Sequence, residues 1–171
     1  MALECNNQPD KLFAGNATAM VLDIASLASV KTFATAFTKQ HKSLDVLCNN
    51  AGIMNTAKGK TSDGFELQFG TNHCGHFALT GALMGALVKA PSPRVVCLSS
   101  CFHNDAMGKK GRIDFEDPNF ETRPYDGWTS YAQSKLANLL FAKEMSKKFP
   151  KIMSVSVHPG FVESVRCCYD T

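Results

Sequence analysis

The 171-residue sequence has no run of about 18 apolar residues, no block of like charge and no CxxC pair among its seven cysteines. The first absence argues against a membrane-spanning helix, and the N-terminus MALECNNQPDK also lacks the apolar segment of a signal peptide. The formal charge of +3 comes from scattered side chains, which argues against a nucleic-acid partner. We therefore expect a soluble, cytoplasmic chain without a membrane segment; an anchor upstream of Met1 would not be seen in it.

The cysteines and histidines indicate neither a disulfide framework nor a metal site. The cysteine count is odd, and Cys48 and Cys97 lie in apolar, strand-like runs, which favours buried free thiols in a reducing compartment. His73, His76 and His103 have no carboxylates or thiolates at ligand spacing, so no metal is expected. The sequence also lacks G-x-S-x-G, which argues against a serine hydrolase.

What is present is an alternation of strand-like and helix-like segments. Four short apolar runs predict strands buried on both faces of a parallel sheet: Ala19–Asp23, Leu44–Cys48, Arg94–Ser99 and Ile152–Val157. Segments with helical spacing separate them: one that follows a predicted N-cap at Ser26, one over Ser62–Lys89 and one that begins near Ser130. This alternation predicts one α/β domain with a doubly wound parallel sheet and right-handed crossovers.

Two further expectations concern the second half of the chain. In the helix that begins near Ser130, the periodicity predicts that Leu136, Leu139, Leu140 and Met145 face the core. Between Cys101 and Trp128 lies a loop rich in Gly, Pro and Asp that is too long for a simple connection. Loops of this length commonly carry recognition, so we expect this one to contact a substrate.

Tyr131 and Lys135, in the run TSYAQSK, lie four residues apart and therefore on one helix face. A free tyrosine has a pKa near 10 and is a poor base at neutral pH. A neighbouring ammonium favours the phenolate and lowers that pKa, which would make the phenol a usable proton acceptor or donor. The pair is therefore a candidate for acid–base chemistry.

Three of the predicted strands end in residues suited to a ligand site. NNAG (Asn49–Gly52) follows one strand, Ser99-Ser100 ends the next, and Pro159-Gly160 follows the last. In an open parallel sheet, ligands bind just beyond the carboxyl ends of the strands. We expect these residues to meet the Tyr131 helix at one edge of the sheet.

In this order, NNAG, the strand ending in Ser99-Ser100, YxxxK and the strand ending in HPG resemble the short-chain dehydrogenase/reductase family, over about Ala19–Gly160. The runs LDIASLASVKTF, Asn72–Phe77 and Ser134–Glu144 are most similar to the branch of retinol dehydrogenases and WW-domain-containing oxidoreductases. The long gap between Ser100 and Tyr131 matches a loop insertion of that branch. The resemblance implies a Rossmann-like fold and an oxidoreductase that transfers a hydride between NAD(P)(H) and an alcohol or carbonyl of an apolar small molecule.

The resemblance also implies roles for individual residues. Tyr131 would be the general acid/base, and Lys135 would lower its pKa and bind the nicotinamide ribose. Ser100 would polarise the substrate oxygen, with Ser99 as its rival, and Asn72 would join a proton relay by holding a water near the lysine. For the cofactor, the family's pattern matches Asp23 (adenine), Asn49, Ala51 and Gly52 (adenosine ribose), Pro159, Gly160 and Val162 (nicotinamide), and Ser164 (carboxamide or phosphate). NAD and NADP both remain open.

One family element is absent: the sequence contains neither TGxxxGxG nor GxGxxG. Only 18 residues precede Ala19, fewer than the roughly 30 that a βαβ unit needs, and 11 follow Gly160. The family's strand order, 3-2-1-4-5-6-7, would place the missing strands 1 and 2 between Ala19–Asp23 and Leu44–Cys48. We therefore expect a single partial domain over residues 1–171, with family strands 3–6, without the first βαβ unit and the C-terminal end.

The motifs that are present and the glycine-rich loop that is missing leave two functions open. The first is the oxidoreductase described above. The alternative is a truncated, catalytically inactive remnant that binds a partner through its helices. In the family, the helices equivalent to Ser62–Lys89 and Ser130–Lys148 form a four-helix interface, which implies a homodimer.

Overall fold

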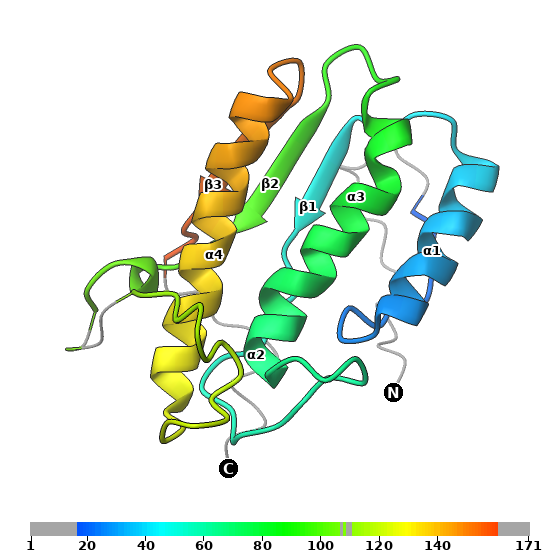
Figure 1. The fold of residues 1–171 in the computed structure, drawn as a ribbon. Coiled ribbons are helices and arrows are strands. Elements are labelled where there is room, and N and C mark those ends of the chain that lie inside the picture. The colour runs from blue at the N-terminus through cyan, green and yellow to red at the C-terminus, as the bar shows by residue number, and fades with distance from the viewer. Residues whose placement is uncertain (1–16, 107, 109–110, 161–171) are drawn as a thin grey trace.

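The computed structural model describes residues 17–106, 108 and 111–160 and shows a three-stranded parallel sheet behind a layer of helices (Figure 1). The strands β1 (Val46–Asn49), β2 (Arg94–Leu98) and β3 (Met153–Val157) lie in chain order. Leu47 pairs with Val95, and Val95 pairs with Ser154. Because all three strands are parallel, their carboxyl ends meet at one edge of the sheet. The predicted parallel α/β class is confirmed.

Helices α1 (Leu27–Gln40) and α4 (Gly127–Lys148) begin at side-chain caps. The hydroxyl of Ser26 accepts a hydrogen bond from Ser29 N, which confirms the predicted N-cap of α1. The carboxylate of Asp126 does the same for Thr129 N, so α4 begins three residues before the predicted start at Ser130. No helix in the described part of the chain is long and apolar enough to cross a membrane.

The helix predicted over Ser62–Lys89 begins later and is not uniform. Glu66 caps a short α2 (Leu67–Phe69), which continues through a π-helical segment, η1 (Gly70–Cys74), into α3 (Gly75–Leu87). Within η1 the backbone hydrogen bonds span one residue more than in an α-helix, as in Gly75 N–H to Gly70 O. Such widened turns are frequent at functional sites, and this one contains Asn72.

The hydrophobic core lies between the sheet and the helices α3 and α4, with α1 beside α3 in the same layer (Figure 1). Val30 and Ala34, which lie on one face of α1, contribute to it. The strands and the other helices supply most of the remaining buried apolar side chains: Leu47, Val95, Cys97, Leu79, Leu83, Leu87, Ala142 and Met145.

Among the described residues, no helix covers the opposite face of the sheet, which corrects the prediction that the strands are buried on both faces. Val46, Met153 and Val155 are 50%, 58% and 38% exposed. Because side chains alternate along a strand, the residues between them face the helices, while Cys48 is an exposed thiol and not a buried one. Within the described residues, the helices that pack on the sheet all lie on the other face.

The segment Ala19–Asp23 is not a strand, contrary to prediction. Asp23 N donates to Ser29 Oγ, and Asp23 O accepts from Ser26 N, so the chain turns directly into α1. Val21 is 94% exposed. A strand needs a hydrogen-bonded neighbour, and no described residue supplies one here. The described part of the chain therefore forms family strands 4–6 and not strand 3.

The buried face of α4 differs from the one that its leucines predicted. Met145 is buried as expected, but Leu140 is 42% exposed, whereas the polar side chains of Gln133, Ser134 and Asn138 are buried. This helix packs against β2 and β3 and also against η1, α2 and the short helix η2 (Cys101–His103). Because α4 has neighbours on more than one side, it also buries polar residues outside the single apolar stripe that its leucines form.

Candidate active site

Helix α4 places Tyr131 and Lys135 next to each other at the carboxyl edge of the sheet. Both side chains are buried, and the Nζ of Lys135 lies 5.4 Å from the centre of the Tyr131 ring. Lys135 Nζ also donates a hydrogen bond of 3.1 Å to Leu98 O, at the end of β2. The predicted pair is thus brought together, and the ammonium is held against the sheet.

The two serines that follow β2 have different partners. The hydroxyl of Ser99 donates to Lys135 O at 2.7 Å and so ties the strand end to α4. The hydroxyl of Ser100 caps the short helix η2 (Cys101–His103), accepting a longer hydrogen bond of 3.4 Å from Phe102 N. The backbone carbonyl takes the Ser99 hydrogen, so the geometry favours Ser100 as the donor to a ligand oxygen.

An aromatic wall of Phe102 and Trp128 lies beside Tyr131. The Phe102 and Trp128 rings stack with their centres 4.9 Å apart. Both rings meet the Tyr131 ring edge-on, at 5.7 Å and 6.4 Å. The partly buried Met54 packs against the same cluster. The Tyr131 ring therefore packs against aromatic and apolar side chains.

Asn72 is fully buried and uses its side chain to hold the loop that follows β1. Its Oδ1 accepts from Ile53 N and its Nδ2 donates to Ile53 O, both at 2.8 Å, and Nδ2 also donates to Ser134 Oγ. A Cβ added at Gly52 would lie 3.0 Å from Asn72 Oδ1 and 3.7 Å from Lys135 Nζ. The NNAG loop, Asn72 and Lys135 thus meet at Gly52.

The NNAG residues do not all face the open edge. Asn49 is only 2% exposed, and its Nδ2 donates to Thr80 Oγ1 in the interior. Ala51 and Gly52 are exposed. The Nε2 of His76 lies 2.8 Å from Ala51 O, and burial lowers the pKa of His76 although this hydrogen bond opposes the shift. His76, which the sequence did not assign, therefore holds the loop as a neutral imidazole.

The turn that carries Asp23 rests on the start of α3. The Asp23 carboxylate is exposed and accepts from Ala25 N at 2.9 Å. A Cβ at Gly75 would lie 2.0 Å from Ile24 O, so only glycine permits this approach of the helix to the turn. The turn that carries Asp23, the predicted adenine contact, and the NNAG loop thus both pack against the segment Asn72–His76.

Pro159 and Gly160 follow β3 at the same edge and are exposed, and Gly160 has a φ of +82°. Val162 and Ser164 lie outside the described residues. The exposed loops around Gly52 and Pro159 thus lie at the same edge of the sheet as Lys135. The sequence offers no glycine-rich cradle for a pyrophosphate.

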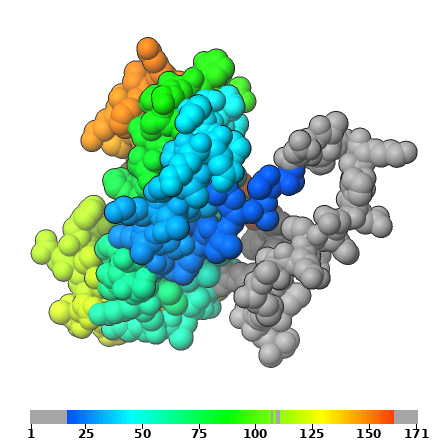
Figure 2. Space-filling model, turned by 90° about the vertical axis from the view of Figure 1, so that its right-hand side faces the viewer, coloured from blue at the N-terminus to red at the C-terminus, as the bar shows by residue number. Residues whose placement is uncertain are grey.

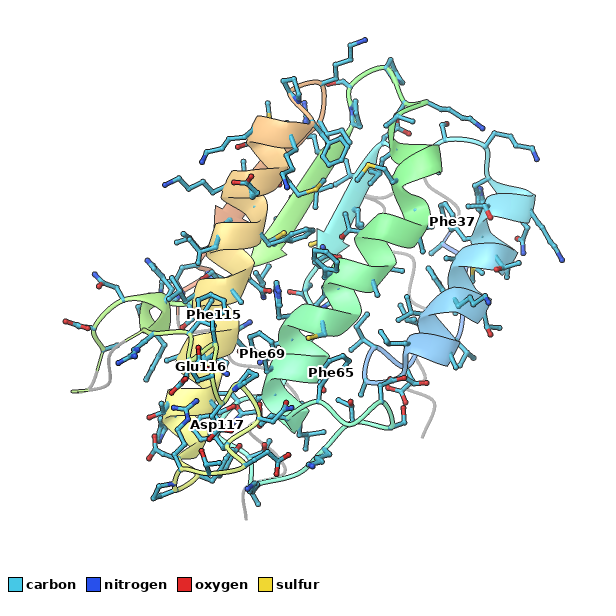
Figure 3. All side chains as sticks on the ribbon, in the orientation of Figure 1. Phe37, Phe65, Phe69, Phe115, Glu116 and Asp117 are labelled. Carbon is cyan, nitrogen blue, oxygen red and sulfur yellow. The ribbon has the colours of Figure 1, made fainter. Side chains whose placement is uncertain are left out.

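The loop between η2 and α4 is anchored by Asp117, not loosely attached. Its carboxylate accepts hydrogen bonds from Glu121 N, Thr122 N and Arg123 N. Desolvation would raise the pKa of Asp117, but these hydrogen bonds and one from the Thr122 hydroxyl outweigh it and lower the pKa to about 2. Figure 3 shows Asp117 with Phe115 and Glu116 beside α4.

The same loop lies against the segment that follows β1 (Figure 2, yellow-green beside teal). Lys60 and Glu121 form an ion pair of 2.7 Å, and Glu66 N donates to Asn119 Oδ1. Glu66 itself is fully buried and accepts from the Tyr125 hydroxyl. Within the described residues, no three His, Cys, Asp or Glu side chains gather as a metal site.

The family model described as short chain dehydrogenase matches residues 2–167. The chain belongs to the short-chain dehydrogenase family. Human retinol dehydrogenase 13 is 43% identical over 141 residues, which are 81% of this chain and 41% of that relative. Human retinol dehydrogenase 14 is 41% identical over 165 residues, 95% of this chain and 47% of that relative. The expected retinol-dehydrogenase-like branch is confirmed, and the chain spans less than half the length of these relatives.

Solved structures agree with this short-chain dehydrogenase fold. An uncharacterized protein from Mycobacterium paratuberculosis is 41% identical and aligns with a TM-score of 0.76, covering 90% of this chain and 54% of that one. A gluconate 5-dehydrogenase from Burkholderia cenocepacia, solved with NADP and tartrate, shares the fold at 22% identity and a TM-score of 0.62, covering 84% of this chain and 51% of that one.

Proposed function

We propose that this chain carries the catalytic part of an NAD(P)-dependent oxidoreductase that interconverts an alcohol and a carbonyl compound, and that residues 1–171 act as one partial domain. The observation that carries the proposal is the buried Lys135 ammonium, 5.4 Å from the Tyr131 ring and fixed on Leu98 O. A bound nicotinamide would supply the hydride chemistry. The choice between NAD and NADP stays open.

In this proposal Tyr131 exchanges a proton with the substrate oxygen. A buried cation one helix turn away favours the phenolate, so the phenol can accept a proton from an alcohol or return it to a carbonyl oxygen. The Ser100 hydroxyl donates a hydrogen bond to the same oxygen as negative charge develops on it. Asn72 keeps the NNAG loop beside Lys135, which favours a place for a relay water near the ammonium.

The cofactor would lie along the carboxyl edge of the sheet. Lys135 would donate to the hydroxyls of the nicotinamide ribose. The backbone at Ala51 and Gly52 would border the adenosine ribose, and Asn49 would support that loop from inside. Asp23 would bind the adenine amino group. Pro159, Gly160 and, outside the described residues, Val162 and Ser164 would meet the nicotinamide and its substituents.

The substrate is proposed to be a long, apolar alcohol or aldehyde. The wall of Phe102 and Trp128 and the neighbouring Met54 offer apolar surface beside Tyr131, and the Asp117 loop lies next to α4. Two relatives that are 41–43% identical are named retinol dehydrogenases. A retinoid is therefore the first substrate to assay. We also propose a reducing, cytoplasmic location, consistent with the free thiols Cys48, Cys74, Cys97 and Cys101.

The experiment uses the 171-residue chain and a chimera in which it replaces the aligned segment of human retinol dehydrogenase 13. Retinal reduction is followed with NADH and with NADPH. Tyr131→Phe should lower kcat about 10³-fold while cofactor affinity stays the same, since only the proton-transferring hydroxyl is lost. Tyr125→Phe is the matched control and should lose far less. Equal rates for Tyr131→Phe and the parent would contradict the assignment.

A second candidate function is partner binding by a catalytically inactive chain, and the partner we propose is a second copy. Phe77 of α3, Leu140 of α4 and Phe149, which directly follows α4, are 57%, 42% and 39% exposed. Apolar side chains gathered on two neighbouring helices favour association. Sedimentation should show a dimer that Phe77→Glu dissociates. Tight binding of NADH or NADPH to the 171-residue chain would argue against the inactive reading.

A further inference from the structure

Asn138 is a buried amide on α4, three residues after Lys135 and therefore on the same side of the helix. Its Nδ2 donates to Asn72 O at 3.0 Å and to Leu98 O at 2.9 Å. Its Oδ1 lies 3.0 Å from Nδ1 of His73. Both amide hydrogens and the amide oxygen are thus engaged, and each partner comes from an element other than α4.

Both carbonyls belong to the frame around Lys135. Leu98 O accepts from Lys135 Nζ as well as from Asn138, so the two side chains share one acceptor. Asn72 O lies in the π-helical segment, where the widened turn changes the usual pairing of backbone carbonyls. One amide therefore fixes the end of β2 to η1 at the level of the lysine.

The two carbonyls determine which end of the Asn138 amide faces them, and His73 Nδ1 lies at the other end. Burial lowers the pKa of His73, although the hydrogen bond to Asn138 Oδ1 opposes the shift, so the ring is neutral at neutral pH. Because Nδ2 donates to the two carbonyls, Oδ1 faces His73, and a neutral ring with its proton on Nδ1 donates to this oxygen. A reversed amide would set its oxygen against two carbonyl oxygens. The centre of the His73 ring lies 5.3 Å from the centre of the Phe69 ring and 6.2 Å from that of the Phe77 ring.

We propose that Asn138 is a positioning residue for Lys135: it holds Leu98 O where the ammonium binds it and thereby sets the ammonium beside Tyr131. This role rests on the proposed Tyr131–Lys135 pair. It predicts that removing the amide changes the electrostatic setting of the phenol, although Asn138 contacts neither the phenol nor a substrate in the proposed mechanism.

The test needs no cofactor, because it follows the ionisation of Tyr131 in the 171-residue chain. The sequence has three tyrosines, Tyr125, Tyr131 and Tyr169, so NMR of ¹³Cζ-labelled tyrosine separates them, with Tyr131→Phe assigning the signal. Asn138→Ala should move the titration midpoint of Tyr131 upward by about one pH unit, because the ammonium is less well placed. His73→Phe, which keeps the aromatic packing, should move it the same way by less.

Gln133→Leu is the matched control. Gln133 is also a fully buried amide of α4, but it accepts from Asp114 N and donates to Pro118 O, on the side of the loop. Its loss should destabilise the protein without moving the Tyr131 midpoint. An equal shift in this control would mean general loosening and would overturn the positioning role.

Lys135→Met separates the two levels of the proposal. An unchanged Tyr131 midpoint in Lys135→Met contradicts the catalytic pair itself. A shift in Lys135→Met without one in Asn138→Ala contradicts only the role of Asn138. Should Asn138→Ala fail to fold, as judged by circular dichroism, His73→Phe decides: no shift in that variant overturns the role.

Discussion

The two faces of the sheet differ in what covers them and in what they hold. On the face toward α3 and α4, Leu47, Val95 and Cys97 are at most 9% exposed, whereas Val46 and Met153 on the other face are 50% and 58% exposed. The candidate catalytic residues Tyr131, Lys135 and Asn72 lie on helices that cover this face. The candidate serines, Ser99 and Ser100, lie at the end of β2. Within the described residues, Tyr131 and Lys135 make contacts with the strand end at Leu98 and with aromatic side chains on the covered side.

The largest effect should come from the cluster itself. In the retinol dehydrogenase 13 chimera, Lys135→Met should lower kcat by about 10²–10³-fold, because the phenol loses the neighbouring charge that favours its ionised form. Lys143→Met, an exposed lysine on the same helix, is the control and should leave kcat unchanged. A small loss for Lys135→Met would remove the lysine from the chemistry and leave it as a tie between α4 and the sheet.

The two faces can be compared directly with one substitution on each. Val95→Ala should lower the free energy of unfolding by about 2–3 kcal/mol, because a fully buried side chain is lost and leaves a cavity. Val46→Ala, on the neighbouring strand and 50% exposed, should cost less than about 1 kcal/mol. Urea unfolding followed by circular dichroism measures both. Similar losses would show that the open face is covered in solution.

Glycines within α3 offer a similar contrast. A Cβ at Gly75 meets Ile24 O, so Gly75→Ala should push the Asp23 turn away and lower stability by about 1–3 kcal/mol. A Cβ at Gly81 meets nothing within 4 Å, so Gly81→Ala should raise stability by up to about 1 kcal/mol through helix propensity. Thermal unfolding of both variants checks the prediction, and a stabilising Gly75→Ala would disprove the close contact with the turn.

The smallest effect concerns the loop beside α4. Because the pKa of Asp117 is lowered to about 2, its ionised form stabilises the folded loop above the ordinary carboxyl pKa, and this contribution is lost as the pH falls through that pKa toward 2. The Asp117→Asn variant should lack this contribution at pH 7, so the stability of its loop should fall less steeply between pH 4 and pH 2. Hydrogen exchange of Thr122 and Arg123 amides reports the loop locally; parallel pH curves for both proteins would contradict the prediction.

The sequence predicted those parts of the fold that depend on local pattern. The N-cap at Ser26, the three paired strands and the Tyr131–Lys135 spacing all follow from short-range rules. Ala19–Asp23 has the composition of a strand but no neighbour to pair with in the described part of the chain, and pairing is not a local property. Within the site, Asn138 went unnoticed because its role arises from contacts with η1 and β2, although its place three residues after Lys135 was a usable signal.

The central claim is that the cluster on the covered face performs hydride-linked proton transfer, and isotope transfer tests it most directly. Retinal is incubated with the chimera and NAD(P)H that carries two deuterium atoms at C4 of the nicotinamide, and the deuterated retinol is quantified over time by mass spectrometry. The parent chimera is expected to form retinol with one deuterium per molecule, and Tyr131→Phe is expected to form the same product about 10³-fold more slowly. Equal rates of deuterated product for Tyr131→Phe and the parent, or unlabelled retinol from the parent, would contradict the claim.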